Sequence, residues 1–122
     1  MTDPVKTKNL VQIARTDDLK NGTMKEFQVG KREILLARVE NKFYAADNIC
    51  PHMGGKLGQG KLKGTMVTCP RHASMFDLRD GRVIRWTDWT GVKASVSKLI
   101  RSPRPILIYQ VKIEGNIISV EL

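Results

Sequence analysis

The sequence predicts an all-β fold, and three observations support this prediction. Short runs of apolar or β-branched residues alternate with turns that contain glycine or asparagine. An Asp-Gly dipeptide at residues 80–81 lies between two such runs, which is typical of a β-hairpin. The chain ends in two further runs around a Glu-Gly-Asn turn at residues 114–116. This alternation is typical of antiparallel strands joined by tight turns.

The first half of the chain contains four expected strands. They are residues 11–14, 24–29, 33–39 and 43–46. Gly30 and Lys31 join the second and third runs, because glycine permits a tight turn there. A polar turn at residues 40–42 leads into the fourth run.

The second half begins with a glycine-rich loop at residues 47–60. The expected strands after it are residues 65–68, 75–78, 83–86, 105–112 and 117–122. Residues 87–104 form a longer insertion without a strand pattern. Apolar residues at 92, 96, 99 and 100 have a helix-like spacing, so we expect one or two helical turns there.

Length and composition predict one soluble domain spanning residues 1–122. The chain has 41% hydrophobic residues and a mean hydropathy of −0.28. The longest apolar stretch, residues 33–39, is far too short to span a membrane, and residues 1–16 contain no apolar signal region. We therefore expect a cytoplasmic protein with no membrane span.

The net charge is +9, from 21 basic and 12 acidic residues. This balance favours either an acidic partner or simply a well-solvated surface. The denser basic band consists of Arg71, Arg79, Arg82, Arg85, Lys93, Lys98, Arg101 and Arg104. Aromatic residues are 6% of the chain and are not interleaved with the basic ones, which argues against binding of nucleic acid.

Two short motifs contain both cysteines and both histidines of the protein. They are Cys50-Pro51-His52 and Cys69-Pro70-Arg71-His72, separated by residues 53–68. Two thiolates and two imidazoles are the ligands of a mixed-ligand [2Fe–2S] centre, with both cysteines on one iron. Such a centre has no net formal charge when oxidised, so its potential lies above that of a four-cysteine cluster.

Structural zinc is the alternative for the same four residues, because zinc also binds thiolate and imidazole. The spacing of the first pair favours iron, since zinc ligands in hairpins are more often separated by two or more residues. With either metal, both cysteines are used as ligands, so no disulfide forms. Reduced thiols fit a reducing compartment.

Other kinds of site are excluded because both histidines and both cysteines are already assigned to these two motifs. A mononuclear iron site or a haem would need further histidines, and none remains. The sequence has no glycine-rich nucleotide motif and no spare serine–histidine–acid set. We therefore expect an electron-transfer protein rather than an enzyme in its own right.

Residues 47–85 closely resemble the Rieske family of iron–sulfur proteins. The resemblance rests on Asp-Asn-Ile-Cys-Pro-His-Met-Gly-Gly and on Cys-Pro-Arg-His-Ala-Ser-Met-Phe-Asp-Leu-Arg-Asp-Gly-Arg. The preceding hairpins and the final hairpin are also similar to those of the family, so the likeness covers nearly the whole chain. It implies stacked antiparallel sheets with a cluster-binding tip formed by loops at about residues 47–58 and 68–78.

The resemblance also implies the ligand arrangement. One [2Fe–2S] cluster would have Cys50 and Cys69 on its inner iron, and His52 and His72 on its outer iron near solvent. Arg71, between the second pair of ligands, is the residue we expect to contact a docking partner.

Several positions differ from the family's respiratory and photosynthetic members. Lys56 and Arg71 stand near the positions of their disulfide cysteines. Phe76 replaces a tyrosine, so one hydrogen bond to sulfur is lost and a lower potential is expected. Ser74 matches the family serine. Ala73 replaces a common glycine, which argues against a positive φ at that position.

Together these features resemble the soluble, disulfide-free, low-potential Rieske-type ferredoxins. The resemblance implies a one-electron carrier that passes electrons from a reductase to a terminal oxidoreductase such as an oxygenase. Both partners are expected to present an acidic docking face to it. One alternative is a small subunit or accessory module of a larger reductase, similar to the Rieske-like small subunit of assimilatory nitrite reductase. A zinc-stabilised interaction module is the other.

Overall fold

A computed structural model of the protein describes residues 10–51, 54–71, 73–85 and 104–122. These residues form three antiparallel sheets. The terminal sheet contains β1 (Leu10–Arg15), β11 (Ile117–Glu121) and β10 (Val111–Glu114), in that order. The central sheet contains β2 (Thr23–Val29), β3 (Arg32–Val39), β4 (Lys42–Asp47) and β9 (Ile108–Tyr109). The distal sheet contains β5 (Lys61–Lys63), β6 (Met66–Thr68), β7 (Met75–Asp77) and β8 (Val83–Arg85).

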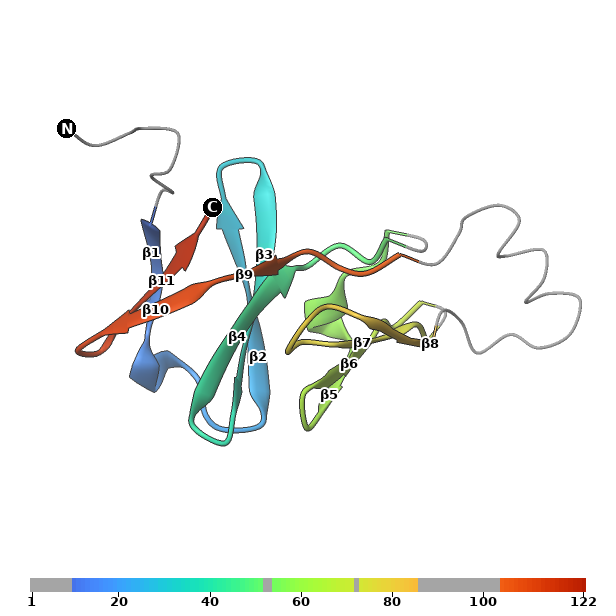
Figure 1. Cartoon of the computed structure of the whole chain (residues 1–122), viewed down its shortest axis with the longest axis horizontal. Helices are drawn as coiled ribbons and strands as arrows, with labels where there is room; N and C mark the ends of the chain where they lie inside the picture. Colours follow the sequence, from blue (N-terminus) through green and yellow to red (C-terminus); the bar gives the residue numbers. More distant parts are fainter. Residues whose placement is uncertain (1–9, 52–53, 72, 86–103) are drawn as a thin grey trace, which may run out of the picture.

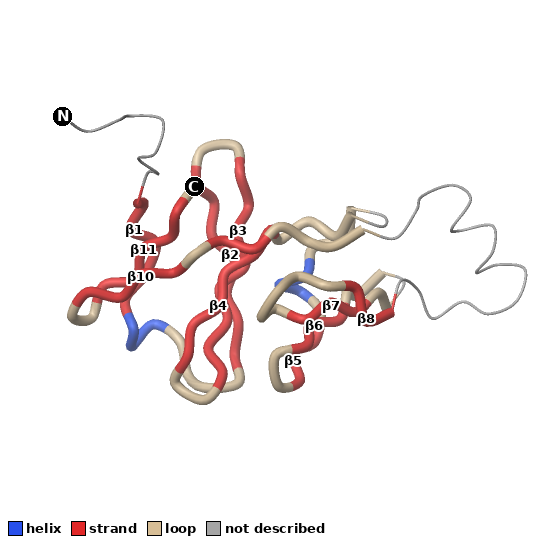
Figure 2. The backbone as a smooth tube through the Cα atoms, viewed as in Figure 1, coloured by secondary structure: helices blue, strands red, loops and turns tan. Residues whose placement is uncertain are grey.

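The central sheet lies between the other two, with the terminal sheet at the left of Figure 1 and the distal sheet at the right. Strands dominate the described backbone, and the helical segments found in it are two short 3-10 turns, η2 (Thr16–Asp18) and η3 (Leu57–Gln59) (Figure 2). Neither turn is long or apolar enough to cross a membrane. The all-β architecture predicted from the sequence is confirmed.

Alternating residues of the central sheet serve two hydrophobic cores, because successive side chains of a strand point to opposite faces. On β3, Leu35 and Ala37 pack into the core shared with the distal sheet. Ile34 and Leu36 pack into the core shared with the terminal sheet. Every one of these four side chains is fully buried. The core on the distal side also contains both cysteines, so it positions the candidate site.

The predicted hairpins are present, with the expected turn residues. Glu40 and Asn41 both have a positive φ, of 51° and 65°, in the tight turn between β3 and β4. Gly115 has a φ of 60° in the turn between β10 and β11. The hairpin around residues 80–81 pairs Phe76 with Val83.

The prediction of one strand over residues 105–112 is wrong. Tyr109 pairs with Ala45 of β4, whereas Val111 pairs with Val120 of β11. The chain changes sheets at Gln110, whose carbonyl accepts a hydrogen bond from the Glu121 N–H. A continuous apolar run does not reveal which sheet each half joins. The 3-10 turn η3 and strand β5 were also not predicted, and the helical turns expected in the insertion lie outside the described residues.

Candidate metal centre

The two cysteines begin loops with the same backbone hydrogen-bond pattern. In the first cysteine loop, residues 50–55, the Cys50 N–H donates to the Gly55 carbonyl at 2.7 Å, and the Gly54 N–H donates to the Cys50 carbonyl at 2.9 Å. In the second cysteine loop, residues 69–74, the Cys69 N–H donates to the Ser74 carbonyl at 2.8 Å, and the Ala73 N–H donates to the Cys69 carbonyl at 3.2 Å. Each loop therefore closes tightly behind its cysteine.

Each loop also turns through a left-handed residue at the same place. Gly54 has a φ of 74° and Ala73 has a φ of 57°. The alanine at position 73 therefore does not prevent a positive φ, contrary to the sequence-based expectation. The two hydrogen bonds of the second loop hold Ala73 in a conformation that costs an L-residue about 1–2 kcal/mol.

The two thiol groups lie in the same hydrophobic core. Cys50 is 1% exposed and Cys69 is 2% exposed, and the fully buried Phe76 belongs to the same cluster of side chains. No disulfide joins the two cysteines. Two buried thiols suit a metal group that hydrolyses when it is exposed to water, because the surrounding hydrophobic side chains exclude solvent.

The first loop contacts the second at Gly55. A Cβ atom at this position would lie 2.6 Å from the Cys69 Sγ atom and 3.1 Å from the Arg71 Cγ atom. The missing side chain therefore leaves room beside the Cys69 sulfur, as a cradle for a metal group requires. The Lys56 Nζ atom, next along the first loop, forms an ion pair with Glu33 of β3 at 3.1 Å.

The structure thus brings together Cys50 and Cys69, two of the four predicted ligands. His52 and His72 lie outside the described residues. The buried thiol pair, the cradle at Gly55 and the softness of thiolate ligands all fit an iron–sulfur group.

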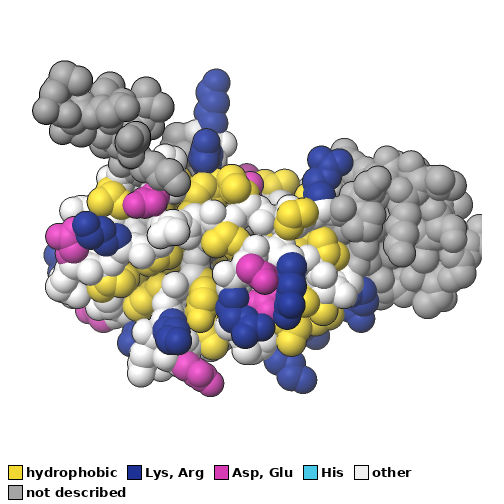
Figure 3. Space-filling view, in the orientation of Figure 1, with side chains coloured by type: hydrophobic (Ala, Val, Ile, Leu, Met, Phe, Trp, Pro, Cys, Tyr) yellow, Lys and Arg dark blue, Asp and Glu magenta, His cyan; other side chains and the backbone are white. Residues whose placement is uncertain are grey.

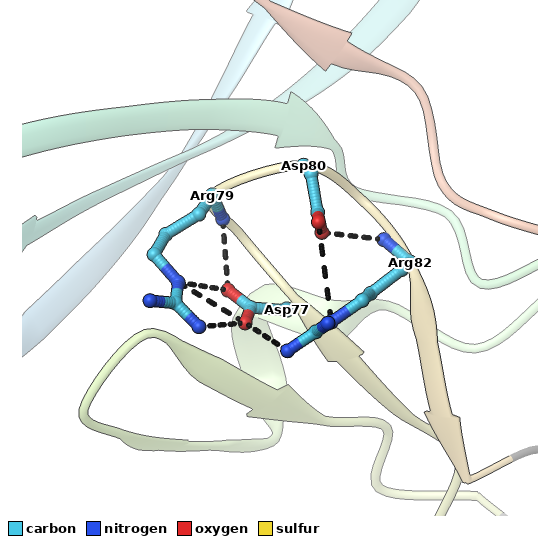
Figure 4. A network of polar contacts seen from close by, with 4 residues as sticks. All are labelled: Asp77, Arg79, Asp80 and Arg82. Carbon is cyan, nitrogen blue, oxygen red and sulfur yellow. Dashed lines mark hydrogen bonds and ion pairs between the residues drawn. The ribbon is translucent and has the colours of Figure 1, made fainter.

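A buried carboxylate follows the second loop on β7. Asp77, which is 2% exposed, accepts hydrogen bonds from the Arg79 side chain at 2.7 and 3.2 Å and forms an ion pair with Arg82 at 3.6 Å (Figure 4). Hydrogen bonds from Arg79 hold the pKa of Asp77 well below its usual range, although burial acts in the opposite direction. The carboxylate therefore stays ionised and fixes the turn between β7 and β8.

The base of the first loop is held by a different group. The Tyr109 hydroxyl on β9 donates to the Asp47 Oδ1 atom at 2.5 Å, and the Arg32 side chain donates to that hydroxyl at 3.3 Å. Burial, together with the Asp47 carboxylate, raises the pKa of Tyr109, so the phenol stays protonated as a donor. This contact ties the end of β4 to β9.

The roles of Asp77 and of Asn48, which precedes the first motif, were not predicted from the sequence. The Asp-Leu-Arg spacing at residues 77–79 is visible in the sequence, but spacing alone does not distinguish a buried aspartate from an exposed one. Asn48 stands two residues before Cys50, and its burial depends on strands far away in the sequence.

Basic side chains are spread over the face seen in Figure 3 rather than gathered in one continuous stripe. A groove of about 620 Å³ lies beside the second loop and includes Cys69 in its wall. Lys61, Arg71 and Arg85 also line it, and its described lining residues include no carboxylate. The Arg85 Nε–H donates to the Ala73 carbonyl at 3.1 Å, which attaches this cation to the second loop. The charged side chains described in the wall of the groove are therefore all basic.

Comparison with known proteins gives a consistent result. A family model described as the Rieske [2Fe-2S] domain matches residues 9–95. The ferredoxin component of the naphthalene 1,2-dioxygenase/salicylate 5-hydroxylase systems of Ralstonia sp. is 35% identical over 78 residues, which cover 64% of this chain and 75% of the relative. The ferredoxin component of the naphthalene 1,2-dioxygenase system of Pseudomonas aeruginosa is 28% identical over 116 residues, covering 95% of this chain and 98% of the relative.

A similar solved structure is the ferredoxin of carbazole 1,9a-dioxygenase from Nocardioides aromaticivorans IC177. It superposes with a TM-score of 0.73 at 27% sequence identity, covering 91% of this chain and 95% of that one.

Proposed function

The chain belongs to the Rieske [2Fe-2S] domain family, and we propose that it is a one-electron carrier, the ferredoxin component of an oxygenase system. The proposed ligands of its single cluster are Cys50, His52, Cys69 and His72. When bound, a cluster of this kind takes up and releases one electron. The observation that carries the proposal is the pair of buried cysteines in two matching loops that meet at Gly55.

In this proposal the chain's own residues shield and position the ligands. Cys50 and Cys69 provide thiolates inside the hydrophobic core, and Phe76 packs in that core without a hydroxyl to donate to sulfur. Removing a hydrogen bond to sulfur lowers the potential. We therefore expect a value in the lower half of the range for His-ligated clusters, which is roughly −150 to +300 mV.

We also propose that the whole chain, residues 1–122, is one domain that carries this cluster and works in a reducing compartment such as the cytoplasm. Both thiols must stay reduced to bind metal, which supports this location. The proposed donor is a reductase, and the proposed acceptor is a terminal oxygenase. The names of the relatives, each a ferredoxin component of an oxygenase system, support this assignment.

A spectroelectrochemical titration of the purified protein tests the carrier function. We expect one reversible one-electron transition per chain, within the range given above. A colourless protein that holds zinc and shows no transition, even after anaerobic reconstitution with iron and sulfide, would contradict the proposal. The four residues would then form a structural zinc site in an interaction module.

The groove beside the second loop supports a docking face for acidic partners. Lys61, Arg71 and Arg85 concentrate positive charge next to Cys69, and the net charge of +9 acts in the same direction. Complementary charges raise the rate of association, and added salt screens them.

The rate of reduction by a flavin-containing ferredoxin reductase, measured against ionic strength, tests this docking face. The double variant K61Q/R71Q is expected to slow the reaction about fivefold at low salt, and little at about 1 M salt, where the Debye length is near 3 Å. The matched control is K112Q, because Lys112 lies on β10 of the terminal sheet and is also exposed. Slowing of the double variant by the same factor at every ionic strength would contradict an electrostatic docking face.

A further inference from the structure

A fully buried asparagine, Asn48, stands just before the first cysteine loop, and its polar groups all have partners. The Asn48 backbone N–H donates to the Glu33 carbonyl at 2.9 Å, and its carbonyl accepts from the Leu57 N–H at 2.7 Å. Its side-chain Nδ2 donates to the Glu26 Oε2 atom at 2.5 Å, and its Oδ1 accepts from the Gly58 N–H at 2.7 Å. An asparagine with every polar group bonded in this way has one allowed orientation.

Asn48 lies at the closed end of a ladder of contacts that leads to the first cysteine. Cys50 is bonded to Gly55, Ile49 forms a bridge with Lys56, and Asn48 is bonded to residues 57–58. Each step joins the two sides of the loop. Asn48 therefore lies where the two sides of the loop come together, two residues from Cys50.

Glu26 connects this closed end to the central sheet. It stands on β2, 22 positions before Asn48 in the sequence, and although Glu26 itself is exposed, its carboxylate reaches the buried Asn48 side chain. Gly58 permits the contact, because a Cβ atom there would lie 2.9 Å from the Asn48 Oδ1 atom and 3.0 Å from the Glu26 Cδ atom. A side chain at position 58 would displace the Glu26 and Asn48 side chains from this contact.

We propose that Asn48 is a positioning residue for the metal centre, and that its hydrogen bond to Glu26 fixes the first cysteine loop on the central sheet. This inference rests on the proposed function, because Cys50 matters as a ligand only if the chain binds the cluster. It assigns a role to a contact between two residues that are distant in sequence and that bind no metal themselves.

Four variants of the holoprotein test the contact. In N48D a carboxylate faces the Glu26 carboxylate, so the hydrogen bond is replaced by repulsion. In N48D/E26Q the two groups are exchanged, so that the amide of residue 26 donates a hydrogen bond to the carboxylate of residue 48. E26A removes the acceptor from an exposed strand position and is expected to fold even if N48D does not. E26Q keeps an acceptor oxygen and is the matched control.

The readouts are the rate of cluster loss to a chelator, the reduction potential and the electron paramagnetic resonance (EPR) spectrum of the reduced protein. We expect N48D to lose its cluster about tenfold faster, the factor expected for a hydrogen bond to a charged group. E26A is also expected to lose its cluster faster than the wild type. Its reduction potential is expected to shift and its EPR spectrum to broaden. N48D/E26Q and E26Q are expected to behave like the wild type in all three measurements.

Two outcomes overturn the inference. One is an E26A variant that matches the wild type in all three measurements. The other is an N48D/E26Q variant that is as impaired as N48D, which would mean that the lost feature is not the hydrogen bond. A wild-type protein that binds no cluster would instead contradict the proposed function, so the two failures are distinguishable.

Discussion

Residues 50–55 and 69–74 form two loops with the same pair of hydrogen bonds, but they are attached to the molecule in different ways. Beside the first loop, the Asn48 side chain donates a hydrogen bond to Glu26 of the central sheet. The second is followed by β7, whose Asp77 is bonded to arginines of its own hairpin. We infer that the shape of a cysteine loop depends on its own backbone hydrogen bonds, whereas its position depends on side chains outside the loop.

Removal of the Asp77 charge tests the hairpin that follows the second loop and is expected to have the largest effect on stability. D77N weakens hydrogen bonds to arginines that are themselves about 60% exposed, so we expect a loss of about 2 kcal/mol at neutral pH. In thermal unfolding this loss is a decrease in Tm of about 8 °C. D80N is the matched control, because Asp80 is exposed in the same turn and its effect is expected to stay below about 0.5 kcal/mol.

The pH dependence of D77N provides a second test of the same carboxylate. Because the pKa of Asp77 is lowered in the folded protein, its contribution to stability is fully present above the ordinary aspartate pKa of about 3.9 and is lost as the pH falls below it. The difference in Tm between wild type and D77N is therefore expected to be constant from about pH 7 to pH 5 and to narrow below about pH 4. A difference that already disappears at pH 6 would contradict this role of Asp77.

An exchange of the left-handed residues tests whether the two loops are equivalent in shape. G54A adds a Cβ atom that meets no other atom within 4 Å, so its cost is conformational and close to 1 kcal/mol. A73G removes the same strain and is expected to stabilise the protein by a similar amount. The expected changes in Tm are about −4 °C and +4 °C. If A73G is destabilising, packing of the Ala73 methyl group outweighs its strain, and the loops are not equivalent.

Local features of the fold were predictable from the sequence. The hairpins around Gly30 and around Asp80-Gly81 depend on turn residues and on short apolar runs, and both are present in the structure. The two cysteines were expected to lie together, and they share one core. The predictions of the hairpins succeed because each depends on neighbouring residues, and the two cysteines lie together as expected of residues proposed to share one metal group.

Features that depend on distant partners were not predictable. The chain changes sheets at Gln110 because residues 108–109 pair with β4 and residues 111–114 pair with β11. The sequence of residues 105–112 does not indicate which strand each half pairs with. Ala73 adopts a positive φ because the second loop closes around it, which overrides the preference for glycine. The contact of Asn48 with Glu26 joins residues that no local pattern connects.

The proposed carrier function requires that the two loops together hold one His-ligated [2Fe–2S] cluster. Metal analysis, combined with EPR spectroscopy of the dithionite-reduced protein, tests it most directly. We expect about two irons and two sulfides per chain and a signal of low average g, as for a cluster with two imidazole ligands. About one zinc per chain and no signal after reconstitution with iron and sulfide would contradict it.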